Sequence, residues 1–164
     1  MADEPLRSQG AARHLVTPRT LLFLERDGRL LLLRGGPGKW FHGRLNGLGG
    51  SVEAGEDTLS AARREAIEET GLTPSGLRLV GLAHVRVEPA VLLLVHHGEL
   101  PAGDLRPTDE GEHVWVDPVE PPDDLLPDLR ALLPRVLGAS ETRAPFSCTL
   151  QPSADGSVRV QFQD

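Results

Sequence analysis

The sequence predicts an α+β fold, with a mixed β-sheet and helices packed on its faces. Two observations predict this class: short apolar runs typical of strands occur in clusters, and two longer segments with helical signals separate those clusters. The length of 164 residues favours one domain, which we place at residues 15–164. Residues 1–14 are mostly polar or small, and we expect them to form a flexible arm.

A β-hairpin is predicted at the start of the domain. The apolar runs Thr20–Glu25 and Arg29–Arg34 flank Asp27-Gly28, a dipeptide typical of tight turns between antiparallel strands. The sixteen residues that follow, Gly35–Gly50, include eight glycines or prolines, and this composition predicts a loop. A loop of this length inside a compact domain usually has a function.

The first helix is predicted from a cap at Asp57 or Thr58 to about Thr70, because Gly71 occupies the usual stop position. Its core-facing residues are expected to be Leu59, Ala62, Ala66 and Thr70. The opposite face of this helix carries the residues that bear most directly on chemistry.

The second half of the chain is predicted to hold five strands and one helix. The strands are expected at Leu77–Val87, Ala90–His97, His113–Val116, Phe146–Leu150 and Ser157–Phe162. The helix is expected at Asp123–Leu137. Pro127 fits its first turn, whereas Pro134 is expected to end or kink it.

The charge of the chain excludes some classes of partner. The sequence has 17 Lys and Arg residues against 24 Asp and Glu, a net charge of -7, so we expect no binding to nucleic-acid polymers or anionic membranes. Cys148 is the single cysteine, which excludes an intramolecular disulfide and a cysteine-rich zinc site. The longest apolar run, Ala90–Val95, is too short to cross a membrane, and no secretory leader is apparent. The expected location is the cytoplasm, and the oligomeric state stays open.

Three glutamates are expected on one face of the first helix. Glu65, Glu68 and Glu69 follow the i, i+3, i+4 spacing that brings side chains together, and like charges at this spacing repel one another. Arg64 stands four residues before Glu68 and offsets only part of that repulsion. A divalent cation would offset the rest, and the all-oxygen donor set points to Mg²⁺ or Mn²⁺. The alternative is a solvated acidic helix face.

The segment around these glutamates resembles the signature of the Nudix (MutT-type) hydrolases, G-x5-E-x7-R-E-U-x-E-E-x-G-U, in which U is a bulky aliphatic residue. The matching residues are Gly50, Glu56, Arg64, Glu65, Ala66, Glu68, Glu69, Gly71 and Leu72. Ala66 is smaller than the aliphatic residue usual at its position. The order of the predicted elements also fits this family over residues 15–163.

The resemblance implies a mixed sheet sandwiched between helices and the hydrolysis of a nucleoside diphosphate linked to another group, X. It assigns Glu65, Glu68 and Glu69 as Mg²⁺ ligands, together with the carbonyl of Gly49 or Gly50. One of these glutamates, or a glutamate outside the segment, would act as the base. The remaining roles that it implies are those of Arg64, which would orient the carboxylates, and Glu56, which would hold the loop to the helix.

Two further resemblances concern X. The stretch WFHGRLNGLGG, residues 40–50, is similar to the N-G-x-G-G stretch of Nudix enzymes that hydrolyse oxidised purine nucleoside triphosphates such as 8-oxo-dGTP. This similarity places Asn46 at the purine, although an Asn-Gly dipeptide also suits a simple turn. In DEGEHVW, Glu110 stands five residues before Trp115, the spacing at which such enzymes have a further metal-site glutamate, and Glu112 is its rival.

The chain departs from that subgroup in the aspartates that read the oxidised base. The subgroup has a pair of aspartates, whereas the candidates here are Asp123, Asp124 and Asp128. The spacing to Pro134 favours Asp128, and Asp123 or Asp124 would equally suit a helix cap. A purine would stack on Trp40 or Phe41, unless these rings belong to the core.

These resemblances therefore imply an enzyme that cleaves a nucleoside triphosphate to the monophosphate and pyrophosphate, with oxidised purine nucleotides as substrates and cleansing of the nucleotide pool as its purpose. The expected partner is a small nucleotide. One alternative keeps the chemistry and changes X to a dinucleoside polyphosphate, ADP-ribose or another nucleotide sugar. The other is a non-catalytic nucleotide sensor, which the intact set of glutamates disfavours.

Overall fold

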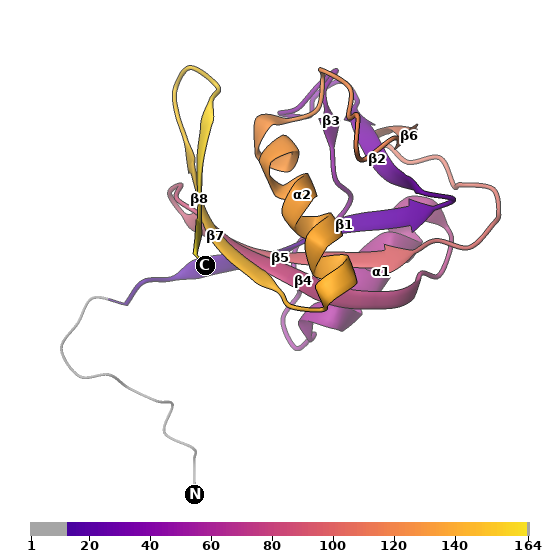
Figure 1. Ribbon diagram of the computed structural model, residues 1–164, viewed down its shortest axis with the longest axis horizontal. Coiled ribbons are helices and arrows are strands. Elements are labelled where there is room, and N and C mark those ends of the chain that lie inside the picture. The colour runs from indigo at the N-terminus through magenta and orange to yellow at the C-terminus, as the bar shows by residue number, and fades with distance from the viewer. Residues whose placement is uncertain (1–12, 164) are drawn as a thin grey trace, which may run out of the picture.

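The computed structural model describes residues 13–163, so the arm predicted at residues 1–14 lies almost entirely outside the described part. The strands are β1 (Val16–Arg26), β2 (Arg29–Gly35), β3 (Leu45–Asn46), β4 (Ser75–Val85), β5 (Ala90–Glu99), β6 (Gly111–Val116), β7 (Phe146–Pro152) and β8 (Val158–Gln163), and the helices are α1 (Thr58–Thr70) and α2 (Pro127–Thr142). Figure 1 shows the two helices on opposite sides of the strands.

The strands form one mixed sheet in the order β3-β2-β1-β5-β4-β7-β8, and β6 also pairs with β2. Antiparallel pairs join β1 to β2, β4 to β5 and β7 to β8, while β1 and β5, and likewise β4 and β7, run parallel. The β7–β8 hairpin extends from the sheet alongside α2 (Figure 1). The hairpin predicted around Asp155-Gly156 is thereby confirmed.

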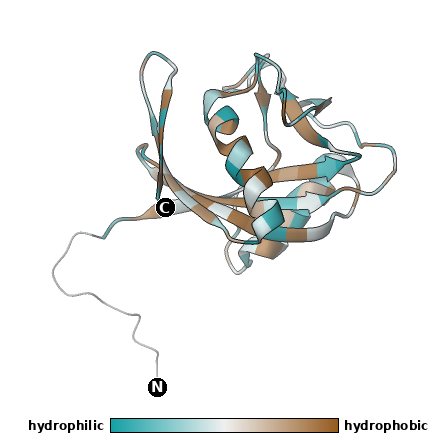
Figure 2. Cartoon of the chain, in the orientation of Figure 1, coloured by the Kyte–Doolittle hydropathy of each residue, from teal (hydrophilic) through white to brown (hydrophobic). Residues whose placement is uncertain are grey.

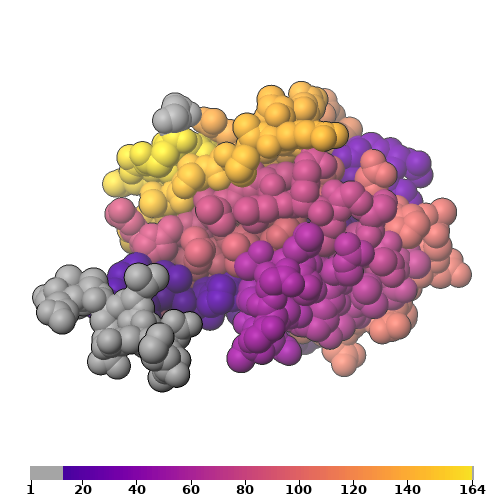
Figure 3. Space-filling view, turned by 90° about the horizontal axis from the view of Figure 1, so that it is seen from below, coloured from indigo at the N-terminus to yellow at the C-terminus, as the bar shows by residue number. Residues whose placement is uncertain are grey.

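Two apolar clusters hold the three layers together, because successive residues of a strand point to opposite faces of a sheet. Leu22 and Leu24 of β1 pack in the cluster that includes α1. Leu21 and Phe23 pack in the larger cluster that includes α2. Figure 2 shows hydrophobic residues gathered on the central strands, and Figure 3 shows residues of α2 above, central strands between and α1 below. The predicted sheet between helices is confirmed.

Local signals place α1 correctly. The Asp57 carboxylate accepts hydrogen bonds from the N–H groups of Leu59 and Ser60, both at 3.0 Å, so it caps the first turn. Gly71 ends the helix in the left-handed conformation, with a φ of 77°. One core expectation is wrong: Leu59 is 41% exposed, because it lies in the first turn beside the cap, and Ala61 is fully buried in its stead.

The replacement Asp57→Ala is expected to lower the Tm of the protein by about 3 °C, because two N–H groups of the first turn lose their acceptor. Thermal unfolding followed by circular dichroism at pH 7 would measure the shift. Asp57→Asn keeps a side-chain acceptor and should lose less than half as much. Equal losses for the two variants would assign the effect to charge and not to capping.

The second helix begins and ends later than predicted. It starts at Pro127, with Leu126 at the cap position and no side-chain cap, so neither Asp123 nor Asp124 caps it. Asp124 instead pairs with Arg34 of β2, a tertiary contact that no local pattern reveals. The helix continues through Pro134, which lies on the exposed face where water can satisfy the carbonyl that loses its partner.

The remaining differences are small. The predicted loop 35–50 contains the two-residue strand β3, and most of the strand boundaries differ from the predicted ones by one to four residues. Neither α1 nor α2, the helices of the described residues, is long and apolar enough to span a membrane.

Candidate active site

Gly49 and Gly50 lie where the loop before α1 passes close to both β1 and α1. The Thr20 N–H donates to the Gly50 carbonyl at 2.7 Å, and the Gly50 N–H donates to the Thr20 hydroxyl at 3.1 Å. Gly49 has a φ of 125°, and a Cβ there would overlap the Thr20 carbonyl oxygen. A Cβ at Gly50 would overlap the Glu65 carboxylate. Glycine therefore allows strand, loop and helix to approach this closely.

Arg64 is the centre of an ion-pair network on α1. Its Nε and Nη2 donate to the two carboxylate oxygens of Glu56 at 2.9 and 3.0 Å, and its Nη1 donates to Glu65 at 2.9 Å and Glu68 at 3.2 Å. Nη2 also donates to the Ser51 carbonyl at 3.0 Å. Hydrogen bonding between the Arg64 and Glu56 side chains raises the pKa of Arg64 and lowers the pKa of Glu56. The expected pairing of Arg64 with Glu68 is confirmed.

Glu69 is the most buried glutamate of this group, with 8% of its surface exposed. Its carboxylate accepts a hydrogen bond from the Gly49 N–H at 2.8 Å. Burial raises the pKa of Glu69 to about 8; the Gly49 hydrogen bond opposes this shift, and the charges of Glu65, Glu110 and Glu68 add to it. A positive charge placed here would therefore be strongly stabilised.

The predicted metal ligands lie near one another without forming a preassembled metal site. Within residues 13–163, no group of three or more Asp, Glu, His or Cys side chains is arranged so that it could hold a metal ion. The side chains of Glu65, Glu68, Glu69 and Glu110 are thus not oriented toward a common metal position in this structure. The physical reason is that Arg64 holds Glu65 and Glu68, while the Gly49 N–H holds Glu69.

The donor chemistry of the site nevertheless fits Mg²⁺ or Mn²⁺. All the candidate donors are oxygens, and the Glu69 carboxylate is buried beside three further carboxylates whose charges act on it. The Gly50 carbonyl already accepts the Thr20 N–H, which favours Gly49 as the source of the backbone ligand. The assignment of these residues as ligands stays a prediction.

Glu110 approaches the same end of α1 from the turn before β6. It pairs with Nζ of Lys39, the single lysine of the chain, and its charge acts on Glu69. Its backbone carbonyl accepts the Gly36 N–H at 3.0 Å, which ties this turn to the loop 36–44. Glu112 is exposed on β6 and has no such effect on Glu69, so Glu110 is the better placed of the two rivals.

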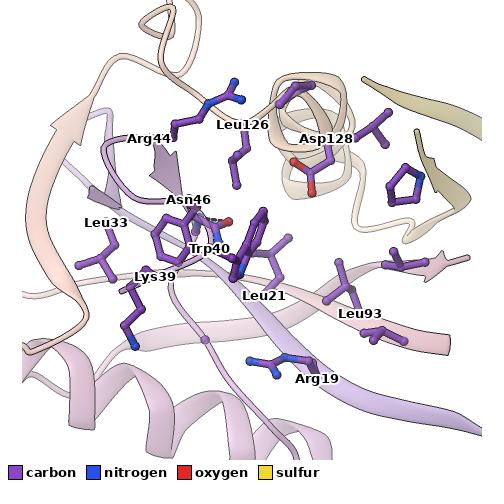
Figure 4. Close-up of a pocket in the computed structure, with 18 of the residues that line it drawn as sticks. Arg19, Leu21, Leu33, Lys39, Trp40, Arg44, Asn46, Leu93, Leu126 and Asp128 are labelled. Carbon is purple, nitrogen blue, oxygen red and sulfur yellow. Dashed lines mark hydrogen bonds between the residues drawn. The ribbon is translucent and has the colours of Figure 1, made fainter. Parts of the chain in front are cut away.

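A cavity of about 760 Å³ opens beside the Glu69 end of α1, a size that suits a nucleotide-sized ligand. Its walls come from β1, the loop before α1, the start of α2, β4, β5 and the turn of the β7–β8 hairpin. The two ends of the cavity differ: Figure 4 shows Asp128 and Arg44 near α2, and Lys39 and Arg19 nearer α1. Apolar side chains such as Leu21 lie between them.

The cavity is lined by three residues that were predicted to bind the purine, and these residues differ in exposure and in their contacts. The Asn46 side-chain oxygen accepts the Gly47 N–H at 2.9 Å, so the expected turn interaction is present while the side chain still faces the cavity. Trp40 is 78% exposed and therefore is not a core residue. Phe41 is 7% exposed and packs in the larger core cluster, with its ring at 5.4 Å from that of Trp40.

Of the three candidate aspartates, Asp128 is the one that lines the cavity. Burial raises its pKa, opposed by backbone hydrogen bonds in the first turn of α2 and by Arg44. Asp123 is exposed and Asp124 is engaged by Arg34. The geometry thus favours Asp128 as the aspartate that binds the base, as the spacing to Pro134 does.

Several cavity residues were not anticipated from the sequence. Arg44 stands two residues from Asn46 within the quoted motif, and its charge near that amide was the available signal. Arg19 of β1 and Ser153 and Ser157 of the β7–β8 hairpin carry no local signal, because only the sheet order brings them to this cavity.

The chain is similar to known proteins in sequence and in fold. The model of the NUDIX domain family matches residues 15–136. The oxidized purine nucleoside triphosphate hydrolase of Danio rerio is 37% identical over 105 residues, which are 60% of this chain and 64% of that protein. The match therefore spans a little less than two thirds of that relative's length.

Solved structures share the fold. A MutT protein from Bacillus halodurans superposes with a TM-score of 0.75 at 20% identity, covering 90% of this chain and 98% of that chain. An ADP-ribose pyrophosphatase from Streptococcus suis superposes with a TM-score of 0.64 at 18% identity, covering 82% and 99%. At such identities these likenesses concern the fold alone, and the substrate has to be argued from the site.

Proposed function

The chain belongs to the NUDIX domain family, and from this premise we propose that it is a metal-dependent hydrolase of nucleoside triphosphates. It releases the nucleoside monophosphate and pyrophosphate, with oxidised purine nucleotides such as 8-oxo-dGTP as substrates, and acts on the free nucleotide pool of the cytoplasm. The observation that carries the proposal is the cavity, which combines Asn46 and Asp128 with the glutamate-bearing end of α1. The name of the relative from Danio rerio supports the same substrate class.

Asn46 and Asp128 read the base. The Asn46 oxygen is held by the Gly47 N–H, which leaves the amide nitrogen to donate to the ligand. Burial raises the pKa of the Asp128 carboxyl, which lines the cavity; this group accepts hydrogen bonds from a base edge and, in its protonated form, also donates one. Oxidation at C8 of a purine changes the pattern of donors and acceptors on its edge, so groups of this kind distinguish the two edges. The exposed ring of Trp40 provides a stacking surface.

The glutamate end of α1 binds the phosphates. Glu65, Glu68, Glu69, Glu110 and the Gly49 carbonyl would hold Mg²⁺ or Mn²⁺, which neutralises phosphate charge and lowers the pKa of water. Arg64 orients Glu65 and Glu68, and Glu56 fixes the guanidinium in turn by accepting two of its hydrogen bonds. A glutamate of this set, or one outside it, accepts the proton of the attacking water.

A substrate panel tests the proposal. The purified protein would be incubated with Mg²⁺ and each of 8-oxo-dGTP, dGTP, dATP, ADP-ribose and a dinucleoside tetraphosphate, with products identified by mass spectrometry. We expect 8-oxo-dGMP and pyrophosphate as the main products. Faster turnover of ADP-ribose or the dinucleoside tetraphosphate would show that this compound, and not 8-oxo-dGTP, is the substrate. Tight binding of nucleotides without any turnover would indicate a sensor.

The variants Asn46→Ala and Asp128→Ala are each expected to lower the selectivity for 8-oxo-dGTP over dGTP by about tenfold or more, because a polar partner of the base is lost. The ratio of kcat/KM values for the two substrates is the measurement. Asp123→Ala is the matched control, since this carboxylate is exposed and lies outside the cavity lining. Equal loss of kcat/KM on both substrates would show that the two side chains have a structural role only.

A further inference from the structure

Arg19 is a cation on the cavity floor. Strand residues two apart share a face, so Arg19 points to the same side of β1 as Leu21, and both line the cavity. Its neighbour on β5 is Leu93, which also lines the cavity. The Arg19 side chain is exposed, and the apolar side chains of Leu21 and Leu93 line the cavity beside it.

The other cations that line the cavity already have partners. Lys39 pairs with Glu110, and Arg44 donates to the Leu125 carbonyl at 3.4 Å and lies within electrostatic range of Asp128. Between residues 13 and 163, no side chain or carbonyl forms an ion pair or hydrogen bond with the Arg19 side chain. Among the described residues, Arg19 is thus the lining cation without a side-chain partner, and its guanidinium is available to an anion from solution.

The position of Arg19 along the cavity indicates which anion it meets. The next residue, Thr20, is hydrogen-bonded to Gly50, and Arg19 itself forms a β-bridge with Ser51, so its backbone adjoins the glycine segment and α1. Figure 4 shows its side chain at the α1 end of the cavity, whereas Asp128 lies at the α2 end. A nucleotide with its base at Asp128 must extend its phosphates over β1 to reach Glu69.

We infer that Arg19 binds the phosphate nearest to the sugar, the one retained in the monophosphate product. This inference rests on the proposed function, since it assumes a nucleotide in the cavity. The cavity lining offers a metal-free nucleotide little other positive charge, because Lys39 pairs with Glu110 and Arg44 lies within electrostatic range of Asp128. Arg19 supplies positive charge to the phosphate and positions it before the outer phosphates meet the glutamates of α1.

A thermodynamic cycle tests the inference without turnover. Isothermal titration calorimetry in EDTA would measure the binding of 8-oxo-dGMP and of 8-oxo-deoxyguanosine, which lacks the phosphate, to the wild type and to Arg19→Gln. The wild type should bind the monophosphate at least about tenfold more tightly than the nucleoside, and Arg19→Gln should remove most of this ratio while nucleoside affinity is unchanged. Arg19→Lys should restore part of it.

Arg29→Gln is the matched control, because it removes the same charge at the exposed β1–β2 turn, away from the cavity lining. An unchanged ratio in Arg19→Gln, or equal weakening of both ligands, would overturn the role of Arg19 while leaving the proposed function in place. Failure of the wild type to bind either ligand, together with no turnover of nucleoside triphosphates, would overturn the proposed function and the inference with it.

Discussion

The replacement Glu69→Gln is expected to lower kcat for the nucleoside triphosphate about 100- to 1,000-fold while the fold stays intact. Glutamine keeps the size of the side chain and an oxygen that accepts the Gly49 N–H, so the packing at the end of α1 is preserved. It cannot supply a negative charge to a metal ion or accept a proton. Steady-state kinetics with 8-oxo-dGTP at saturating Mg²⁺ would measure the loss.

The same variant should be more stable than the wild type in the metal-free state at high pH. Because burial raises the pKa of Glu69 from 4.5 to about 8, the folded chain keeps a proton that the unfolded chain releases. The free energy of unfolding of the wild type therefore falls as the pH rises from about 4.5 to about 8, by an amount on the order of 5 kcal/mol. Glutamine has no titratable proton, so Glu69→Gln should not show this fall in the free energy of unfolding.

Urea unfolding in EDTA at pH 5 and pH 9 would compare the two proteins, with Glu141→Gln as the matched control. Glu141 is exposed on α2, so its replacement should leave both kcat and the pH dependence as in the wild type. Adding Mg²⁺ at pH 9 should stabilise the wild type and not Glu69→Gln. A fully active Glu69→Gln variant would show that Glu69 has no role in the reaction. The same pH dependence of the unfolding free energy in both proteins would contradict the raised pKa of Glu69.

The region around α1 could be predicted from the sequence because its signals are local. The Asp57 cap, the stop at Gly71 and the spacing of the glutamates all lie within a few residues of the structure that they determine. The pairing of Arg64 with Glu68 follows from helical spacing alone. Leu59 was misplaced because apolar periodicity does not reveal how the first turn meets solvent.

Features that depend on tertiary contacts could not be predicted in the same way. The start of α2 was misplaced because Asp124 is a plausible cap by type, yet its carboxylate pairs with Arg34 in another part of the sheet. The place of Arg19 in the cavity follows from the parallel pairing of β1 with β5, which no short pattern encodes. The orientations of Glu65, Glu68 and Glu69 depend on their hydrogen-bond partners, which are Arg64 for the first two and the Gly49 N–H for the third.

The replacement Gly49→Ala is expected to lower the free energy of unfolding by about 3 kcal/mol or more. Part of this cost is the positive φ of 125°, which an L-residue rarely adopts. The larger part arises because a Cβ at Gly49 would overlap the carbonyl of Thr20, a backbone group of a central strand that cannot move aside without breaking sheet pairing. Urea denaturation of the metal-free protein at pH 7 would measure the change.

Gly28→Ala separates these two contributions. Gly28 also has a positive φ, 72°, but nothing lies within 4 Å of a Cβ placed there, so its replacement should cost only about 1 kcal/mol. Equal losses at the two glycines would mean that the loop yields to the added methyl group, and that the close approach of Gly49 to β1 is not required. A larger loss at Gly49 has a functional consequence, because the N–H that holds the Glu69 carboxylate belongs to the same residue. The close approach that makes Gly49 irreplaceable then also sets the position of Glu69 relative to the cavity.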